Sequence, residues 1–200
     1  MTRDSVAGFI LIGGAASRMG RDKSRLVIED ETFVERIAHE LAPVTSQVFV
    51  VGRPEQLDLG LKIVRDVHPQ WGALGGVHGA LANCAAAWAL IVACDLPQVK
   101  ASLFERLLSL REGFDAVAPV QPDGRRQPLC AVYRVAECLP CAATLIESGE
   151  RKPVALLQSV MTRWVQFTEL ADLPGADDFF DNINTPQDYL RISQEADPFD

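Results

Sequence analysis

Charged residues at two places in the sequence are suited to bind a metal-bound polyphosphate. The first lies in the segment LIGGAASRMGRDKSRL, where Gly13 and Gly14 are followed by Arg18 and Lys23. Adjacent glycines let backbone N–H groups approach phosphate oxygens closely, and the two cations would neutralise their charge. The second is Asp95, which follows a wholly apolar stretch. A carboxylate there can hold Mg²⁺, a hard cation that prefers carboxylate and phosphate oxygens.

Two familiar phosphate-binding patterns are excluded by the spacing. A P-loop requires Gly-Lys-Ser/Thr at its end, whereas Gly20 is followed by Arg-Asp-Lys, and the pattern G-x-G-x-x-G is absent. The net charge of −8 excludes a broad nucleic-acid surface, because such a surface needs many clustered cations. Arg18, Arg21, Lys23 and Arg25 form a local cationic patch on an acidic chain, which favours a small polyphosphate.

The segments that carry these residues alternate between apolar strands and amphipathic helices, which favours a mostly parallel sheet covered on both faces. We predict strands at 6–12, 48–51, 61–64, 88–93, 115–120, 129–133 and 163–167. We predict helices capped by Thr32, at 74–87, capped by Ser102, at 136–148, after Pro153, and at 187–193 after Thr185 and Pro186. Ligands of such sheets bind beyond the carboxyl ends of the strands, where Gly13 and Asp95 both fall.

The cysteines carry no clear chemistry. Their number, five, is odd, which favours free thiols over a disulfide framework. Cys138 and Cys141 form one CxxC, but no second pair completes a zinc site, so a packing role is predicted. The N-terminus lacks the pattern of a signal peptide and no apolar run could span a bilayer, so we expect a cytoplasmic protein without membrane or nucleic-acid partners.

Four segments, in order, resemble nucleotidyltransferases of GT-A-like Rossmann-type fold, and among them the molybdenum cofactor guanylyltransferases. The first loop is similar to LAGGxSxRMGxDK, and residues 72–76 are similar to G-[PA]-L-x-G. Residues 93–97 are similar to the CD-x-P element, and residues 181–186 to N-x-N-T-P. The resemblance covers most of the chain.

The resemblance implies a three-layer α/β fold of the nucleotide-diphospho-sugar transferase type, with a mostly parallel sheet and a small, partly antiparallel acceptor lobe. We expect a single domain over 1–194, divided into a nucleotide-binding part at 1–112 and an acceptor-side part at 113–194, followed by a frayed tail at 195–200. The implied reaction transfers GMP from GTP to the terminal phosphate of molybdopterin, or molybdenum cofactor, and releases pyrophosphate. Docking to molybdoenzyme maturation proteins is a further expectation.

The family motifs assign roles to individual residues. Arg18, Lys23 and Asp95 are the expected catalytic residues, and Asp95 is also the expected Mg²⁺ ligand. The expected nucleotide-binding residues are Leu11, Ile12, Gly13, Gly14, Lys23, Asp66 and Asp95. Asn182 and Asn184 are expected on the acceptor side. His78 receives no catalytic role, because a phosphate nucleophile needs no general base at neutral pH.

Several alternatives stay open at this stage. The same scaffold could use CTP or another phosphate acceptor, or bind a nucleotide without catalysis. Asp95 is not part of a D-x-D motif, which disfavours sugar transfer, and Arg18, Lys23 and Asp95 together favour an enzyme. Val51-Gly52 stands where the family often has Asn, so any base contact there would come from the backbone. The loop with Arg125, Arg126 and Gln127 is either an acceptor contact or a solvated hairpin tip.

Overall fold

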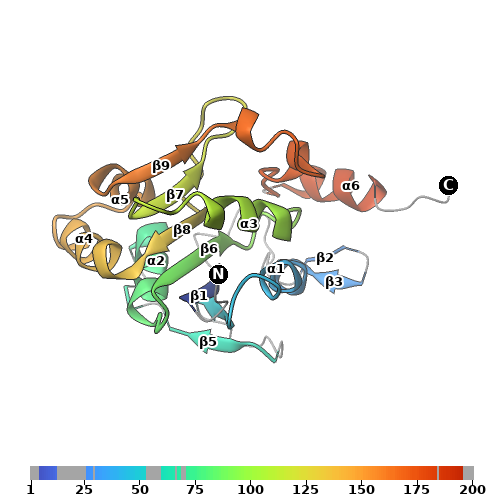
Figure 1. Cartoon of the computed structure of the whole chain (residues 1–200). Helices are drawn as coiled ribbons and strands as arrows, with labels where there is room; N and C mark the ends of the chain where they lie inside the picture. Colours follow the sequence, from blue (N-terminus) through green and yellow to red (C-terminus); the bar gives the residue numbers. More distant parts are fainter. Residues whose placement is uncertain are drawn as a thin grey trace.

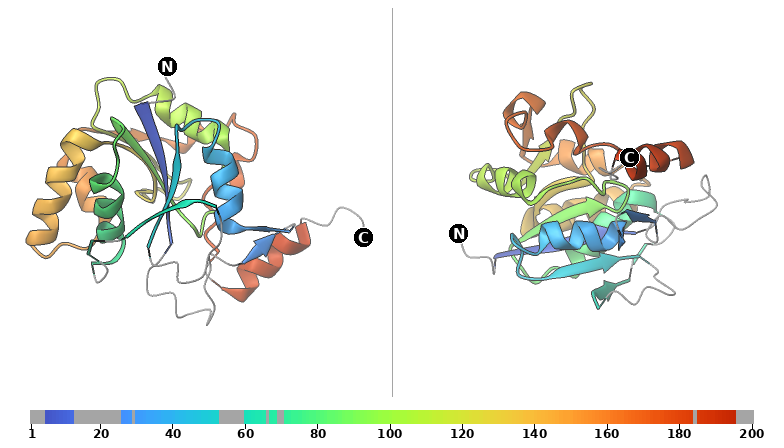
Figure 2. Two further views of the ribbon diagram at one scale, coloured as in Figure 1. Left: turned by 90° about the horizontal axis from the view of Figure 1, so that it is seen from below. Right: turned by 90° about the vertical axis from the view of Figure 1, so that its right-hand side faces the viewer.

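The protein is a three-layer sandwich with a central twisted sheet between two layers of helices (Figures 1 and 2). The computed structural model describes residues 5–12, 26–28, 30–52, 60–65, 67–68, 71–183 and 185–195. Its strands are β1 (Val6–Leu11), β2 (Val27–Ile28), β3 (Glu31–Thr32), β4 (Val48–Val51), β5 (Lys62–Val64), β6 (Trp88–Ala93), β7 (Ala116–Pro119), β8 (Cys130–Arg134) and β9 (Thr162–Val165). Its helices are α1 (Phe33–Leu41), α2 (Gly72–Ala82), α3 (Ala101–Ser109), α4 (Val135–Glu147), α5 (Pro153–Ser159) and α6 (Pro186–Glu195), with short 3₁₀ turns η4 (Phe167–Glu169) and η5 (Ala176–Asp178).

The described residues form a seven-stranded sheet in the order β5-β4-β1-β6-β8-β7-β9. β8 runs antiparallel to both of its neighbours, and the other pairings are parallel. The mostly parallel sheet predicted from the sequence is therefore confirmed, and its antiparallel strand β8 belongs to the second half of the chain. The hairpin β2–β3, which no sequence pattern predicts, forms a separate two-stranded sheet.

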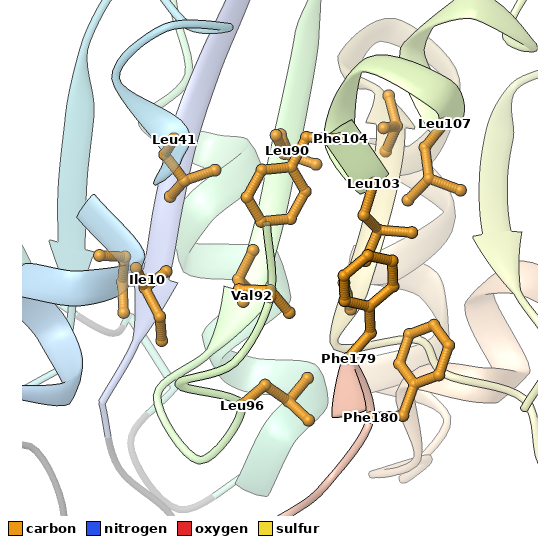
Figure 3. Packing of buried hydrophobic residues seen from close by; sticks show 14 of the residues in the cluster. Ile10, Leu41, Leu90, Val92, Leu96, Leu103, Phe104, Leu107, Phe179 and Phe180 are labelled. Carbon is orange, nitrogen blue, oxygen red and sulfur yellow. The ribbon is translucent and has the colours of Figure 1, made fainter. Parts of the chain in front are cut away.

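Alternating residues of the strands point their side chains into two hydrophobic cores, one on each face of the sheet. The core shown in Figure 3 packs Ile10, Leu90 and Val92 of the strands against α1 and α3. Phe179 and Phe180 of the C-terminal part close the same core. The opposite core packs the other faces of β1 and β6 against α2, α4 and α5. Both faces are thus covered, as the continuous apolar runs of these strands require.

The start of α1 agrees with the prediction, and the start of α3 corrects it. Thr32 caps α1 in a reciprocal capping box with Glu35. Ser102 does not cap α3, because the helix begins one residue earlier, at Ala101. There the Ala101 N–H donates to a carboxylate oxygen of Glu40 on α1, at 2.8 Å. A side chain from a neighbouring helix therefore supplies the cap.

The boundaries of α2 differ from the prediction, whereas the start of α6 agrees with it. α2 begins at Gly72 and ends at Ala82, earlier than predicted, and Asn83 donates from its side chain to the Gly79 carbonyl at 2.9 Å. Thr185 and Asp188 cap α6 reciprocally, which confirms the predicted N-cap. The tail at 196–200 lies outside the described residues.

The five cysteines are free thiols, as predicted. Cys138, a residue of α4, is fully buried in the core, and burial raises the pKa of its thiol to about 12. A neutral, buried thiol packs like a small apolar side chain. The CxxC of α4 is accordingly part of the helix packing.

Candidate active site

The carboxyl ends of β1 and β6 meet at the centre of the sheet. The two strands are parallel neighbours, with Leu11 opposite Ala93 at their ends. The chain leaves β1 through α1 towards β4 on one side, and leaves β6 through α3 towards β7 on the other. The connections diverge here, so this is the topological switch point at which open α/β sheets bind ligands.

The backbone at this point is fixed by hydrogen bonds across three strands. The Cys94 N–H donates to the Leu11 carbonyl at 3.1 Å, and the Ile12 N–H donates to the Val51 carbonyl at 2.9 Å. Leu11 and Ile12 are 6% and 7% exposed, so their side chains belong to the cores. What these two residues offer a ligand at the sheet edge is their main chain.

At the end of β4, Val51 and Gly52 stand where the resembled family often has Asn. Val51 is 2% exposed and packs in the core, so its side chain does not reach the edge of the sheet. The next residue, Gly52, has a φ of +144°, and a Cβ there would lie 2.1 Å from the Ile12 carbonyl oxygen. Only glycine tolerates this approach, which brings two stretches of backbone together beside the switch point.

Asp95 lies in a turn directly after β6. The Leu96 N–H donates to the Ala93 carbonyl at 3.3 Å, and the Leu96 side chain is buried. The Asp95 carbonyl accepts a hydrogen bond from the Ile183 N–H at 3.0 Å. Asp95 itself is half-buried. The turn is therefore held by its buried neighbour and by the C-terminal segment, and it places a carboxylate-bearing residue at the switch point.

Asn182 is brought close to this turn by the same contact. Its neighbour Ile183 is fully buried in a small cluster with Leu26, Ile28 and Phe33. Asn182 is half-buried and lies one residue from the N–H that binds Asp95. The predicted site residues Gly13, Gly14, Arg18, Lys23, Asp66 and Asn184 lie outside the described residues.

The glycines at the start of α2 allow the helix to pack tightly against the sheet edge. A Cβ at Gly75 would lie 2.5 Å from the His68 carbonyl oxygen, and a Cβ at Gly76 would lie 3.4 Å from the Leu11 side chain. His78 is 9% exposed, and its ring stacks edge-on against His68 with the centroids 4.9 Å apart. The G-A-L-G-G motif thus has a packing reason, and His78 lies among packed neighbours.

The loop at 121–127 connects β7 to β8, which lie on the other side of β6 from β1 in the strand order. The Arg125 guanidinium pairs with Asp123 at 2.5 Å, and the Arg125 N–H donates to the same carboxylate, which lowers the pKa of Asp123. Arg126 lies over the Trp164 ring at 4.5 Å. The tip of the loop is therefore a structured turn whose two arginines have different partners.

Two glutamines at the base of this loop are both buried, although no sequence motif marks them as a pair. Gln121 and Gln127 are each 8% exposed. The Gln127 N–H donates to the Pro119 carbonyl at 3.0 Å, and the Ala93 N–H donates to the Leu129 carbonyl at 2.8 Å, which ties this base to the end of β6. The available signal was the position of Gln121 directly after a buried apolar strand.

The donor groups at the site limit what a metal ion could use. Within the ranges that the structure describes, no three His, Cys, Asp or Glu side chains gather into a metal cluster. Asp95 offers one carboxylate beside a main chain arranged for a ligand, which fits Mg²⁺ held through one or two carboxylates plus substrate phosphates. Burial raises the pKa of the nearby Cys130 thiol to about 12, so this thiol is not a nucleophile at neutral pH.

Known proteins identify the family. A profile described as the MobA-like NTP transferase domain matches residues 8–163, from β1 into β9. The chain belongs to this family. It is 33% identical over 186 residues to the probable molybdenum cofactor guanylyltransferase of Pelotomaculum thermopropionicum, covering 92% of this chain and 90% of the relative. It is 28% identical over 189 residues to the molybdenum cofactor guanylyltransferase of Vibrio vulnificus, covering 92% and 93%.

A solved structure of the same type confirms the fold. The molybdopterin-guanine dinucleotide biosynthesis protein A of Archaeoglobus fulgidus has a TM-score of 0.80 at 24% identity, over 94% of this chain and 97% of that chain. The predicted three-layer nucleotidyltransferase fold is therefore confirmed. The profile and the curated relatives confirm the family resemblance and the enzyme class. In the described part of the chain, no helix has both the length and the apolar character needed to cross a membrane.

Proposed function

We propose that this MobA-like transferase moves GMP from GTP to the terminal phosphate of molybdopterin and releases pyrophosphate. The relatives named molybdenum cofactor guanylyltransferase, matched over 92% of the chain, support this reaction. The structural observation that carries it is the junction of β1 and β6, where Leu11, Ile12 and Asp95 lie together at the switch point.

The nucleotide occupies the β1 side of this junction. Its purine contacts the main chain of Leu11 and Ile12, and its phosphates lie along Gly13 and Gly14. Arg18 and Lys23 neutralise the charge that grows on the departing pyrophosphate, a stabilisation that is largest in the transition state. Asp66, which follows β5 in the sequence, is assigned to the nucleotide side by the family motif. Because Val51 is buried, base selectivity rests on backbone groups in this part of the site.

Asp95 is the residue that would hold Mg²⁺, which would supply positive charge to offset that of the phosphates. The remaining contribution of the chain is positional. The turn at 93–96 is held by the Leu96 N–H and by the Ile183 N–H, so the main chain that carries Asp95 needs little reorganisation when GTP binds.

The acceptor occupies the opposite side, between the C-terminal segment and the loop at 121–127. Asn182 and Asn184 orient it through their side-chain amides. A phosphate oxygen of the acceptor attacks the α-phosphorus of GTP in line. The bond from that phosphorus to the oxygen that bridges it to the β-phosphorus breaks, and this oxygen leaves with the pyrophosphate. The attacking oxygen is already ionised at neutral pH, so the mechanism assigns no general base. The buried position of His78 agrees with this.

The cellular setting follows from the substrates. GTP is available in the cytoplasm, so the reaction is placed there. The product carries a cofactor destined for molybdoenzymes, which makes their maturation proteins the expected docking partners.

The function is tested by pyrophosphate release with each of the four ribonucleoside triphosphates, with and without molybdopterin. We expect release with GTP in the presence of molybdopterin, and a product whose mass equals that of the acceptor plus GMP less one water. Equal release from all four nucleotides would contradict the assignment of GTP. Release that needs no acceptor would show a hydrolase instead.

A further inference from the structure

The C-terminal segment at 181–191 joins two parts of the site that are far apart in the sequence. At one end the Ile183 N–H donates to the Asp95 carbonyl at 3.0 Å. At the other end the Tyr189 hydroxyl donates to the Val27 carbonyl at 2.6 Å, across 162 positions of sequence. Figure 2 shows α6 alongside the hairpin β2–β3. The segment therefore links the turn after β6 to the strand that follows residues 13–25.

Hydrogen bonds and an ion pair within the C-terminal segment hold its two ends in a fixed arrangement. The Asp188 N–H donates to the Thr185 hydroxyl at 3.1 Å, and the Thr185 N–H donates to the Asp188 carboxylate at 2.8 Å. The Arg191 guanidinium pairs with Asp181 at 2.5 Å, which ties the helix to the residues before it. Ile183 and Tyr189 are thus held in a defined relation by bonds within the segment.

Three consecutive carbonyls at the start of the hairpin, those of residues 26–28, each accept a hydrogen bond from a different residue. The Leu26 carbonyl accepts from the Phe33 N–H at 3.0 Å, and the Ile28 carbonyl accepts from the Arg36 guanidinium at 3.5 Å. Both donors come from α1, which directly follows the hairpin. The bond from Tyr189 to Val27 between them is the one that comes from the C-terminal segment.

Apolar contacts hold the ring of Tyr189, and with it the hydroxyl, in place. It packs against Phe33 with the ring centroids 6.4 Å apart, and it borders the cluster of Leu26, Ile28 and Ile183. Leu26 and Ile183 therefore touch the same cluster from the two ends of the linked path. A shift of the hairpin would strain both the Tyr189 hydrogen bond and the packing beside Asp95.

We propose that Tyr189 is a positioning residue for nucleotide binding. Its hydroxyl fixes the strand that follows the glycine-rich segment relative to the Asp95 turn, so the two sides of the nucleotide site are aligned before GTP binds. This inference rests on the proposed function, because that function assigns the glycine-rich segment and Asp95 to the same nucleotide. The residue lies beyond the part of the chain that the family profile matches.

The test is Tyr189→Phe, which keeps the ring on Phe33 and removes only the hydroxyl. We expect the Kd for GTP with Mg²⁺, measured by calorimetry without acceptor, to rise about 2- to 10-fold, the range set by one net hydrogen bond. We expect kcat at saturating GTP to change by less than about 2-fold, because the reacting groups are untouched.

Tyr133→Phe is the matched control. Its hydroxyl also donates to a main-chain carbonyl at 2.6 Å, that of Pro128, but this bond lies on the other side of β6. We expect Tyr133→Phe to leave the Kd for GTP unchanged, although it lowers the thermal midpoint. Leu190→Ala changes an exposed residue of α6, the helix that carries Tyr189. It should leave both the Kd for GTP and the thermal midpoint unchanged.

The outcomes separate the two proposals. An unchanged Kd in Tyr189→Phe, with a wild-type protein that binds GTP, overturns the positioning role alone. An equal rise in Tyr133→Phe also overturns it, because the effect would then be general loosening of the fold. A wild-type protein that does not bind GTP overturns the proposed function, and the positioning role with it.

Discussion

Among the described residues, Asp95 combines a position at the switch point with a side chain that can bind a metal ion. It follows the central strand β6, its carbonyl is bound by the C-terminal segment, and its neighbour Leu96 anchors the turn in the core. Replacement by Asn keeps the size and hydrogen bonding of the side chain and removes its charge. These features make the residue suitable for a test of charge alone.

We expect Asp95→Asn to keep the fold and to lower turnover by about 100-fold or more, as for the loss of one charge-stabilising group. The measurements are pyrophosphate release at saturating Mg²⁺ and the circular dichroism spectrum. The fold should persist because the carbonyl, not the carboxylate, receives the hydrogen bond from Ile183. Near-normal turnover would place the metal elsewhere.

Lys23 tests the electrostatics of the glycine-rich segment, which lies outside the described residues. If Lys23 stabilises departing pyrophosphate, Lys23→Ala should lower kcat and kcat/KM for GTP by similar factors of about 100-fold, with KM little changed. A contact made equally in the ground state would raise KM and leave kcat unchanged. Steady-state kinetics with varied GTP distinguishes the two patterns.

Arg21→Ala is the control for this experiment, because the family motif gives this neighbour no role. It should behave like the wild-type protein. If it proves as damaging as Lys23→Ala, the segment contributes only diffuse positive charge, and the assignment of Lys23 is wrong.

At the scale of elements, the junction of α1 and α3 shows how one helix supports another beside the site. Glu40 accepts from the Ala101 N–H at 2.8 Å, and the Lys100 ammonium lies 3.3 Å from the same carboxylate. The first N–H groups of a helix have no partner within it, so this carboxylate satisfies a donor and complements the helix dipole. α3 follows the Asp95 turn directly, which makes this cap relevant to the site.

We expect Glu40→Ala to lower the free energy of unfolding by about 1 kcal/mol, the usual cost of losing an N-terminal cap. Chemical denaturation gives this quantity directly. Glu105→Ala, which removes an exposed carboxylate on α3 itself, should change it by less than about 0.5 kcal/mol. Equal losses in the two variants would mean that Glu40 acts through net charge and not through the cap.

At the scale of the whole molecule, the junction of the two strands predicts how the ligands affect stability. The described residues present Asp95 without a cluster that could hold a metal on its own, so Mg²⁺ is expected to bind together with the nucleotide phosphates. The ion and GTP should therefore stabilise the fold jointly.

We expect GTP with Mg²⁺, at about 100 times the Kd, to raise the thermal midpoint by about 5–10 °C, from the linkage relation and the usual scaling for a chain of this size. Mg²⁺ alone should leave the midpoint unchanged, and chelation with EDTA should remove both turnover and the shift. A differential scanning fluorimetry series with each ligand alone and in combination measures this. A large shift with Mg²⁺ alone would reveal a metal site independent of the nucleotide.

The sequence by itself determined the features that depend on near neighbours. Continuous apolar runs indicated buried strands, and Thr32 and Thr185 marked helix starts, because a cap is formed within three or four residues. The order of strand, turn and carboxylate also placed Asp95 at the ligand-binding edge, since parallel strands share that edge. The roles of Lys23 and Asn184 remain predictions from the family motifs.

Tertiary structure alone decided the contacts between distant segments. The carboxylate that caps α3 lies 61 positions before it, and the hydroxyl that binds Val27 lies 162 positions after it. The same holds for Gly52, whose approach to Ile12 exists only because β4 is placed beside β1. Such contacts leave no local pattern, because they depend on the strand order, and that order is chosen by the packing of the two cores as a whole.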